Sequence, residues 1–178
     1  MNFSYAAIEN ASELVSLINS AYRLPSSSPG WTDEREVISG PRIDAQTILS
    51  EFEAGRFLLS RTAPEEEVVG CVHISGLEDN AWYISLLAVK PTYQRGGLGA
   101  SILNEVEKQA AAEGASCLRI TVINHRKPLI AWYERRGFRK TGAEVPFPYD
   151  DPSVGIPLRD DLALVVLEKP LRADETTD

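Results

Sequence analysis

Cysteine and histidine are scarce in this chain, and long apolar runs are absent. Its 178 residues include two cysteines and two histidines. Cys71 and Cys117 fall in predicted strands without a second cysteine or a histidine at metal-ligand spacing, which favours two small core residues over a zinc site or a disulfide. The apolar runs are too short to span a membrane, and residues 1–4 lack a basic segment followed by an apolar stretch. These absences predict a cytoplasmic protein with no membrane anchor and no metal.

Basic residues are the minority among the charged side chains. There are 26 acidic and 18 basic residues, giving a formal net charge of −8. This balance disfavours nucleic acid as a partner. An acidic surface suits a cationic amine, but it also serves solubility alone, and we favour the second interpretation. The length fits one domain over residues 1–171 with a flexible tail at 172–178.

One glycine-rich turn stands between an apolar strand and a helix, at Gln94-Arg95-Gly96-Gly97-Leu98-Gly99-Ala100. Glycines let the backbone approach a ligand closely, and the helix start offers unpaired N–H groups to an anion. Arg95 adds a forked cationic donor. A P-loop would need Lys and then Ser or Thr where Ala100 and Ser101 stand, and a dinucleotide fingerprint would need a small residue at Ile102. The turn is therefore predicted to bind the pyrophosphate of a ligand that neither of these two nucleotide-binding motifs recognises.

Hydrophobic spacing predicts a mixed α/β chain. The expected strands are 3–8, 56–61, 68–75, 81–89, 117–123, 138–145 and 162–168. Helices are expected after a capping-box-like pair, Asn10 and Glu13, after Asp44, over 98–113, and after Pro128. The segment from 81 to 123 reads as strand, crossover helix and strand, which implies a parallel pair. Residues 23–42 and 146–157 are expected to be long loops.

Two motifs in a fixed order identify a family resemblance. Gln94, Gly97 and Gly99 follow an apolar strand that ends Leu87-Ala88-Val89, and a later helix ends Trp132-Tyr133-Glu134-Arg135-Arg136-Gly137-Phe138. This order is similar to that of the GNAT superfamily of N-acetyltransferases over most of the chain. The resemblance implies a single-domain α/β (α+β) fold with a mixed, mostly antiparallel sheet and helices on both faces. It also implies a central parallel strand pair splayed by a bulge, and acetyl-CoA as the acyl donor.

The resemblance also assigns the cofactor site. Backbone groups of Leu87, Ala88 and Val89 are expected beside the pantetheine and the thioester, and the residues from Arg95 to Ala100 around the pyrophosphate, namely Arg95, Gly96, Gly97, Leu98, Gly99 and Ala100. For Gln94, a contact with the cofactor and a plain turn role are weighed equally. Many relatives have an asparagine at the position of Arg126. Either Asn124 replaces it, or Arg126 reaches a coenzyme A phosphate, and both alternatives stay open.

Tyr133 is the catalytic candidate that the resemblance implies, because the family tyrosine lies near the coenzyme A sulfur. An ordinary phenol is protonated at neutral pH and can donate to a leaving thiolate. The alternative is a core aromatic residue. The general base is open: Thr121 stands where some relatives have glutamate, and the remaining options are Glu34, His73, Asp150 and Asp151. His73 is expected to be a satisfied buried histidine, and the loop carboxylates are expected to be solvated.

The acceptor is expected to bind between the two long loops, with Trp31, Arg42, Phe147 and Tyr149 as wall residues. The favoured function is transfer of an acetyl group to a primary amine of a small molecule, directly in a ternary complex. One alternative is a non-catalytic acyl-CoA-binding sensor, and another is acetylation of a protein N-terminus or lysine. A homodimer stays open, since the sequence does not give the oligomeric state.

Overall fold

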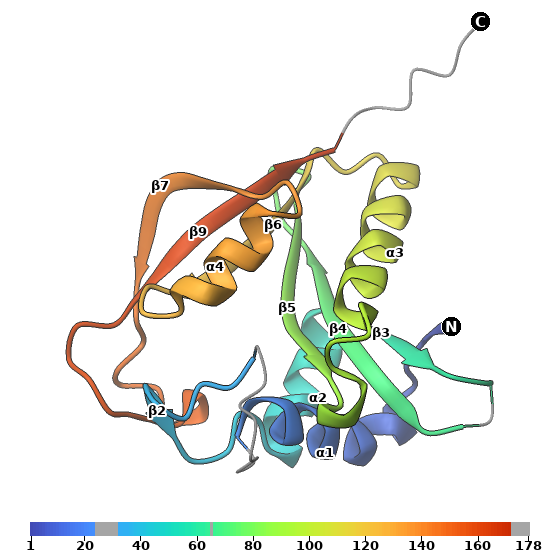
Figure 1. Ribbon diagram of the computed structural model, residues 1–178, viewed down its shortest axis with the longest axis horizontal. Coiled ribbons are helices and arrows are strands. Elements are labelled where there is room, and N and C mark those ends of the chain that lie inside the picture. Colours follow the sequence, from blue (N-terminus) through green and yellow to red (C-terminus); the bar gives the residue numbers. More distant parts are fainter. Residues whose placement is uncertain (24–31, 65, 172–178) are drawn as a thin grey trace, which may run out of the picture.

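The computed structural model describes residues 1–23, 32–64 and 66–171 (Figure 1). Its centre is a seven-stranded sheet in the order β1-β3-β4-β5-β6-β9-β7. The strands are β1 (Asn2–Tyr5), β3 (Arg56–Arg61), β4 (Val68–Gly76), β5 (Trp82–Val89), β6 (Cys117–Ile123), β7 (Arg139–Pro146) and β9 (Ala163–Pro170). The pair β5 and β6 is parallel, and the other neighbours are antiparallel. The expected mixed, mostly antiparallel sheet is confirmed. The tail expected at 172–178 lies outside the described residues.

Helices cover both faces of the sheet. They are α1 (Ala11–Tyr22), α2 (Ala45–Ala54), α3 (Leu98–Ala112) and α4 (Lys127–Glu134), with single 3-10 turns η1 (Ile8–Asn10), η2 (Pro91–Tyr93) and η3 (Pro152–Val154). Side chains alternate between the two faces along each strand. Phe57 and Leu59 of β3 therefore pack with α1 and α2, whereas Leu58 joins the larger cluster under α3 and α4. Within the described ranges, no helix has the length and apolar character needed to cross a membrane.

The helix starts were predicted with mixed success. Asp44 caps α2 as expected, since its carboxylate accepts hydrogen bonds from the backbone N–H groups of Gln46 and Thr47. The capping box at Asn10 and Glu13 is wrong. The Glu13 carboxylate instead accepts a 2.8 Å hydrogen bond from the Val68 N–H and forms an ion pair with Arg61. These partners from other strands hold Glu13 away from the start of its own helix.

The two long loops carry a feature that the sequence did not indicate. The short strands β2 (Ile38–Ser39) and β8 (Ile156–Pro157) form an antiparallel pair. The Leu158 N–H extends this pairing by donating to the Val37 carbonyl at 2.9 Å. Val37 and Ile38 share a small apolar cluster with Phe147 and Leu162. The loops are thus fastened to each other on one side of the sheet.

A bulge opens the centre of the sheet at β5. Between the pairs Cys71 with Ala88 and His73 with Ser85, β4 advances two residues while β5 advances three. Leu86 carries the distortion with φ +50°, a conformation that side chains other than glycine rarely adopt. Pairing of β5 with β6 is confined to Trp82 with Leu118 and Tyr83 with Arg119. Figure 1 shows the two strands diverging beyond these pairs, so the expected splay is confirmed.

Candidate active site

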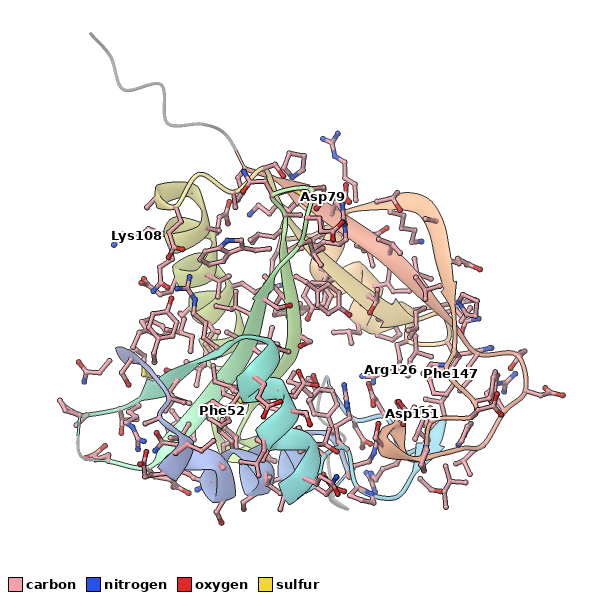
Figure 2. All side chains as sticks on the ribbon, turned by 180° about the vertical axis from the view of Figure 1, so that it is seen from behind. Phe52, Asp79, Lys108, Arg126, Phe147 and Asp151 are labelled. Atoms are coloured by element: carbon pink, nitrogen blue, oxygen red, sulfur yellow. The ribbon has the colours of Figure 1, made fainter. Side chains whose placement is uncertain are left out.

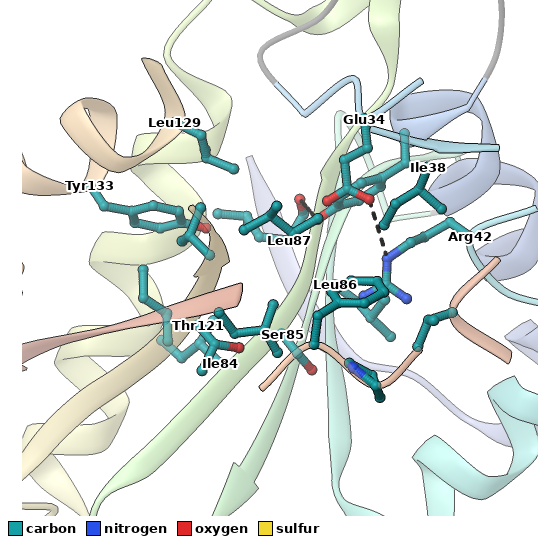
Figure 3. Close-up of a pocket in the computed structure, with 18 of the residues that line it drawn as sticks. Glu34, Ile38, Arg42, Ile84, Ser85, Leu86, Leu87, Thr121, Leu129 and Tyr133 are labelled. Atoms are coloured by element: carbon teal, nitrogen blue, oxygen red, sulfur yellow. Dashed lines mark hydrogen bonds and ion pairs between the residues drawn. The ribbon is translucent and has the colours of Figure 1, made fainter. Parts of the chain in front are cut away.

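A pocket of about 200 Å³ lies where β5 and β6 diverge. Its walls come from both strands, from α1 and α4, and from the two long loops, and include Tyr22, Arg42, Tyr83, Leu87, Thr121, Tyr133 and Phe147. Figure 3 shows Tyr133 and Thr121 on one side, Glu34 and Arg42 on the other, and Leu87 between them. Figure 2 shows Arg126 and Phe147 on the side of the molecule that carries β7 and β9. The bulge therefore places a cavity at the middle of the molecule.

Tyr133 lies on the buried face of α4 and is only 7% exposed. Its ring packs edge-on against Trp132 and Phe138, with ring centroids 4.9 and 5.4 Å away. The hydroxyl points into the pocket (Figure 3). Burial raises the pKa of Tyr133 above its usual range, so the phenol keeps its proton at neutral pH. Tyr133 is thus both a core aromatic residue and a proton-bearing group at the cavity wall.

The backbone of β5 is held firmly beside the bulge. The Leu87 carbonyl accepts a hydrogen bond of 3.0 Å from the buried Tyr22 hydroxyl. The Val89 carbonyl accepts one of 2.9 Å from the Gln94 side-chain amide. Leu87 and Val89 pack into one core, and Ala88 packs into the core on the other face. The side chains therefore fix this segment, while its edge beyond Tyr83 is outside the β6 ladder.

The glycine-rich turn has the character of an anion site. Arg95 is exposed and adopts φ +72°, and Gly97 starts α3 with φ +80°. No side chain caps α3, so none of its first N–H groups is consumed by a cap. A Cβ added at Gly97 would meet no atom within 4 Å. The donor set of helix N–H groups and a guanidinium fits a pyrophosphate. Gln94 bonds to Val89 instead, which is the turn role that the sequence left open.

Glu34 is the centre of a buried ion cluster. Its carboxylate lies 2.8 Å from Arg23 Nη1, 3.4 Å from Arg126 Nη1 and 4.0 Å from Arg42 Nε. The Glu34 side chain is 11% exposed, so the expectation of a solvated loop carboxylate is wrong. The three arginines come from the end of α1, from the following loop and from the start of α4. Folding brings them together, and the local sequence around Glu34 carries no sign of it.

The other candidate bases lie elsewhere. His73 is buried, with Nδ1 3.0 Å from Ser85 Oγ and Nε2 2.9 Å from the Glu51 carbonyl oxygen, as expected for a satisfied histidine. Asp150 and Asp151 are exposed, and the Asp151 carboxylate accepts a hydrogen bond from the Ser153 N–H. Among the candidates, only Glu34 lines the pocket, and it is held in ion pairs.

The structure separates the two residues considered for the asparagine role. The Asn124 side-chain amide donates to the Asp161 carbonyl at 2.9 Å, and Asn124 lines a different cavity from the one that holds Tyr133. Arg126 faces Glu34 and the Thr32 carbonyl, 3.2 Å away. The fold thus brings Arg126, and not Asn124, toward the pocket region.

Of the expected wall residues, Arg42 and Phe147 line the pocket, whereas Trp31 lies outside the described residues. The Tyr149 hydroxyl accepts a hydrogen bond from the Leu162 N–H and so supports the loop. Sequence reasoning missed Tyr22, which follows the apolar spacing of α1 and was indistinguishable from a core residue. It also missed Tyr83, whose hydroxyl lies 2.6 Å from Thr121 Oγ1 in the pocket wall.

The two cysteines are free. Cys71 is fully buried in β4, and burial raises the pKa of its thiol to about 12, as suits a core residue. Cys117 is only partly buried, so the expectation of a second core cysteine is wrong. In the part of the chain that the structure describes, no group of three or more His, Cys, Asp or Glu side chains is arranged to hold a metal.

Comparison with known proteins gives consistent matches. A family model described as the acetyltransferase (GNAT) family matches residues 16–138. An "IAA acetyltransferase" of Azospirillum brasilense is 31% identical over 100 residues, which span 56% of this chain and 64% of that protein. The chain therefore matches slightly less than two thirds of that relative's length.

Solved structures share the fold. The ribosomal-protein-S18-alanine N-acetyltransferase of Escherichia coli superposes with a TM-score of 0.67 at 17% identity, covering 99% of this chain and 98% of that one. An IAA acetyltransferase of Bacillus cereus gives a TM-score of 0.66 at 18% identity, covering 96% of this chain and 99% of that one. At such identities these matches establish the architecture and leave the acceptor open.

Proposed function

Since the chain belongs to the GNAT acetyltransferase family, we propose that it transfers an acetyl group from acetyl-CoA to a primary amine of a small molecule, directly in a ternary complex. The observation that carries this proposal is the pocket at the β5 bulge. There, free strand edge, a buried protonated tyrosine and an ion cluster meet in one cavity. The anion-binding turn follows the same strand.

The residues present fit coenzyme A. Arg95, Gly96, Gly97, Leu98, Gly99 and Ala100 would hold its pyrophosphate, and the backbone from Leu87 to Val89 would hold the pantetheine arm. When bound, acetyl-CoA supplies an activated thioester. A backbone N–H on the β5 edge beyond Tyr83 can donate to the thioester carbonyl as negative charge develops there. Asn124 does not enter this proposal, because its amide is bonded to Asp161.

Tyr133 would act as the acid. It holds a proton at its hydroxyl oxygen and can pass that proton to the sulfur as the amine nitrogen bonds to the acyl carbon and the carbon–sulfur bond breaks. Burial in apolar surroundings raises the pKa of Tyr133. The same surroundings disfavour a thiolate formed beside it, and so raise the pKa of the coenzyme A thiol as well. The transfer is then less unfavourable than the raised tyrosine pKa alone would suggest. The amine loses its own proton to water.

A small acceptor is favoured by the way the loops close. The pairing of β2 with β8 and the Leu158 to Val37 hydrogen bond join the two loops across one side of the pocket. Phe147 and Ile38 lie under this junction and line the cavity. An extended peptide needs an open groove, whereas the joined loops cover one side of this cavity.

The direct test is acceptor-dependent release of the coenzyme A thiol. Purified protein is mixed with acetyl-CoA and a panel of small primary amines, peptides with free N-termini and peptides with internal lysines. We expect release with a subset of the small amines. Binding of acetyl-CoA without release for any amine would indicate a non-catalytic sensor, and release with peptides alone would indicate a protein acceptor.

A further inference from the structure

The pocket wall opposite Tyr133 carries an excess of positive charge. Arg23, Arg42 and Arg126 surround the single carboxylate of Glu34. Asp33, the neighbouring acid, is engaged by Arg35 through hydrogen bonds of 2.6 to 3.1 Å. Glu34 is the only acidic residue that lines the cavity within the described ranges. Arg23 and Arg42 line the cavity together with Glu34, so these three side chains carry a formal charge of +1 there, in a chain whose net charge is −8.

Arg42 is positioned to use this charge on a ligand. Its Nε faces Glu34, and its guanidinium lies 5.5 Å from the centre of the Tyr22 ring, which leaves the terminal nitrogens directed away from Glu34. The side chain is 29% exposed and reaches into the pocket (Figure 3). A guanidinium edge held by a carboxylate and an aromatic ring is a preorganised receptor for a planar or tetrahedral anion.

Arg23 gives a second, independent indication of an anion site. Its side chain is 6% exposed and also lines the pocket. Nη1 bonds to Glu34, but the buried Nε and Nη2 atoms have no hydrogen-bond partner among the residues that the structure describes. Buried donors of a charged group are rarely left unsatisfied. The unsatisfied donors are therefore consistent with a pocket that takes a negatively charged group.

We propose that the acceptor carries a compact anion, a carboxylate or a phosphonate, on the same molecule as its amine, and that Arg42 binds this anion. This inference rests on the proposed acetyl transfer and adds the acceptor class to it. Figure 3 shows Arg42 across the pocket from Tyr133, so an acceptor anchored at Arg42 directs its amine toward Tyr133. The cofactor phosphates have their own donors at the glycine-rich turn, none of which lines this pocket.

The test compares matched acceptors. The panel contains amino acids and aminoalkylphosphonates of several chain lengths, each with its neutral amide or ester, and the parent alkylamines. We expect kcat/KM of the best anionic amine to exceed that of its neutral analogue by about 10- to 100-fold, as for a hydrogen bond to a charged group. The carboxylate and phosphonate series then show which anion fits.

Variants locate the effect. Arg42→Met should lower kcat/KM for anionic amines by about 10- to 100-fold, lower it much less for neutral amines and leave the coenzyme A affinity unchanged, and Arg42→Lys should restore the preference partly. Arg139→Met, at an exposed position of β7, is the matched control and should change nothing. Equal turnover of anionic and neutral amines, or a loss of coenzyme A affinity in Arg42→Met, would overturn the inference.

Failure of the acetyl transfer itself remains distinguishable. If no amine supports thiol release, the proposed function is wrong. Calorimetric titration of the same amino acids and phosphonates then decides the anion site: binding to the wild type but not to Arg42→Met supports it, and no binding refutes it.

Discussion

Replacing Glu34 with glutamine should destabilise the protein far more than its modest change in shape suggests. Glutamine keeps the side-chain length but removes the charge that Arg23 and Arg126 face at 2.8 and 3.4 Å. All three side chains are about nine-tenths buried. Removing one partner of a buried pair costs about 3–5 kcal/mol, because the remaining charge is left without compensation. Arg42 adds little, since it is more exposed and 4.0 Å away.

Urea unfolding at neutral pH measures this loss. For a chain of this size, about 3–5 kcal/mol corresponds to a fall in Tm of roughly 6–20 °C. The matched control is Glu67→Gln, which removes an equally short pair with Lys90 at 2.6 Å, but with a carboxylate that is 62% exposed. Exposed pairs contribute about 1 kcal/mol or less. If Glu34→Gln loses no more stability than Glu67→Gln, the cluster does not hold the loop to α1 and α4, and our reasoning about it is refuted.

Three further predictions concern Tyr133 as the proposed acid, a closely packed glycine and a buried histidine. Tyr133→Phe should lower kcat by about 10²- to 10⁴-fold with the coenzyme A affinity nearly unchanged. The control Tyr5→Phe, on the exposed β1, should leave kcat as it is, and equal kcat for the wild type and Tyr133→Phe would remove the proposed role. Gly55→Ala should cost about 1–3 kcal/mol in urea unfolding, because its Cβ would lie 2.2 Å from a carbonyl oxygen of β4, whereas Gly76→Ala meets nothing within 4 Å; similar losses would contradict this packing. Burial lowers the pKa of His73, so the unfolded state binds more protons below about pH 6.5, and stability should fall from pH 7.5 to pH 5.5; the same slope in His73→Gln would show that other groups cause it.

Much of the fold was predictable, because local signals and tertiary structure agree along most of the chain. Asp44 caps the start of α2, and Gly97 and Gly114 bracket α3 at positions where the backbone has a positive φ. The nearly continuous apolar residues of β3 and β4 reflect a sheet with helices on both faces. Where local and tertiary signals conflict, as at Glu13, the tertiary partner prevailed.

The centre of the site was less predictable. The motif order indicated a bulge, but nothing in the apolar run identifies Leu86 as its residue, because packing imposes the φ of +50° against the preference of leucine. The arginines of the cluster lie 8, 11 and 92 positions from Glu34, and each alone resembles an ordinary surface charge. Periodicity describes elements and carries no information about which loop side chains meet.

The short pairing of β5 with β6 also makes the width of the pocket sensitive to the angle between these two strands. The two strands meet only at the residue pairs of Trp82 and Tyr83. The Arg56 guanidinium lies 4.7 Å from the centre of the Trp82 ring and packs against this junction. The six remaining residues of β5 extend about 20 Å beyond this junction. A rotation of about 5° at the junction moves the end of β5 by roughly 2 Å. This displacement exceeds the roughly 1 Å by which two reacting atoms can be misplaced before the rate falls strongly. The distance between the two halves of the site therefore depends on the short pairing at Trp82 and Tyr83 on one side of the pocket, and on the β2–β8 pair and the Glu34–Arg126 ion pair on the other.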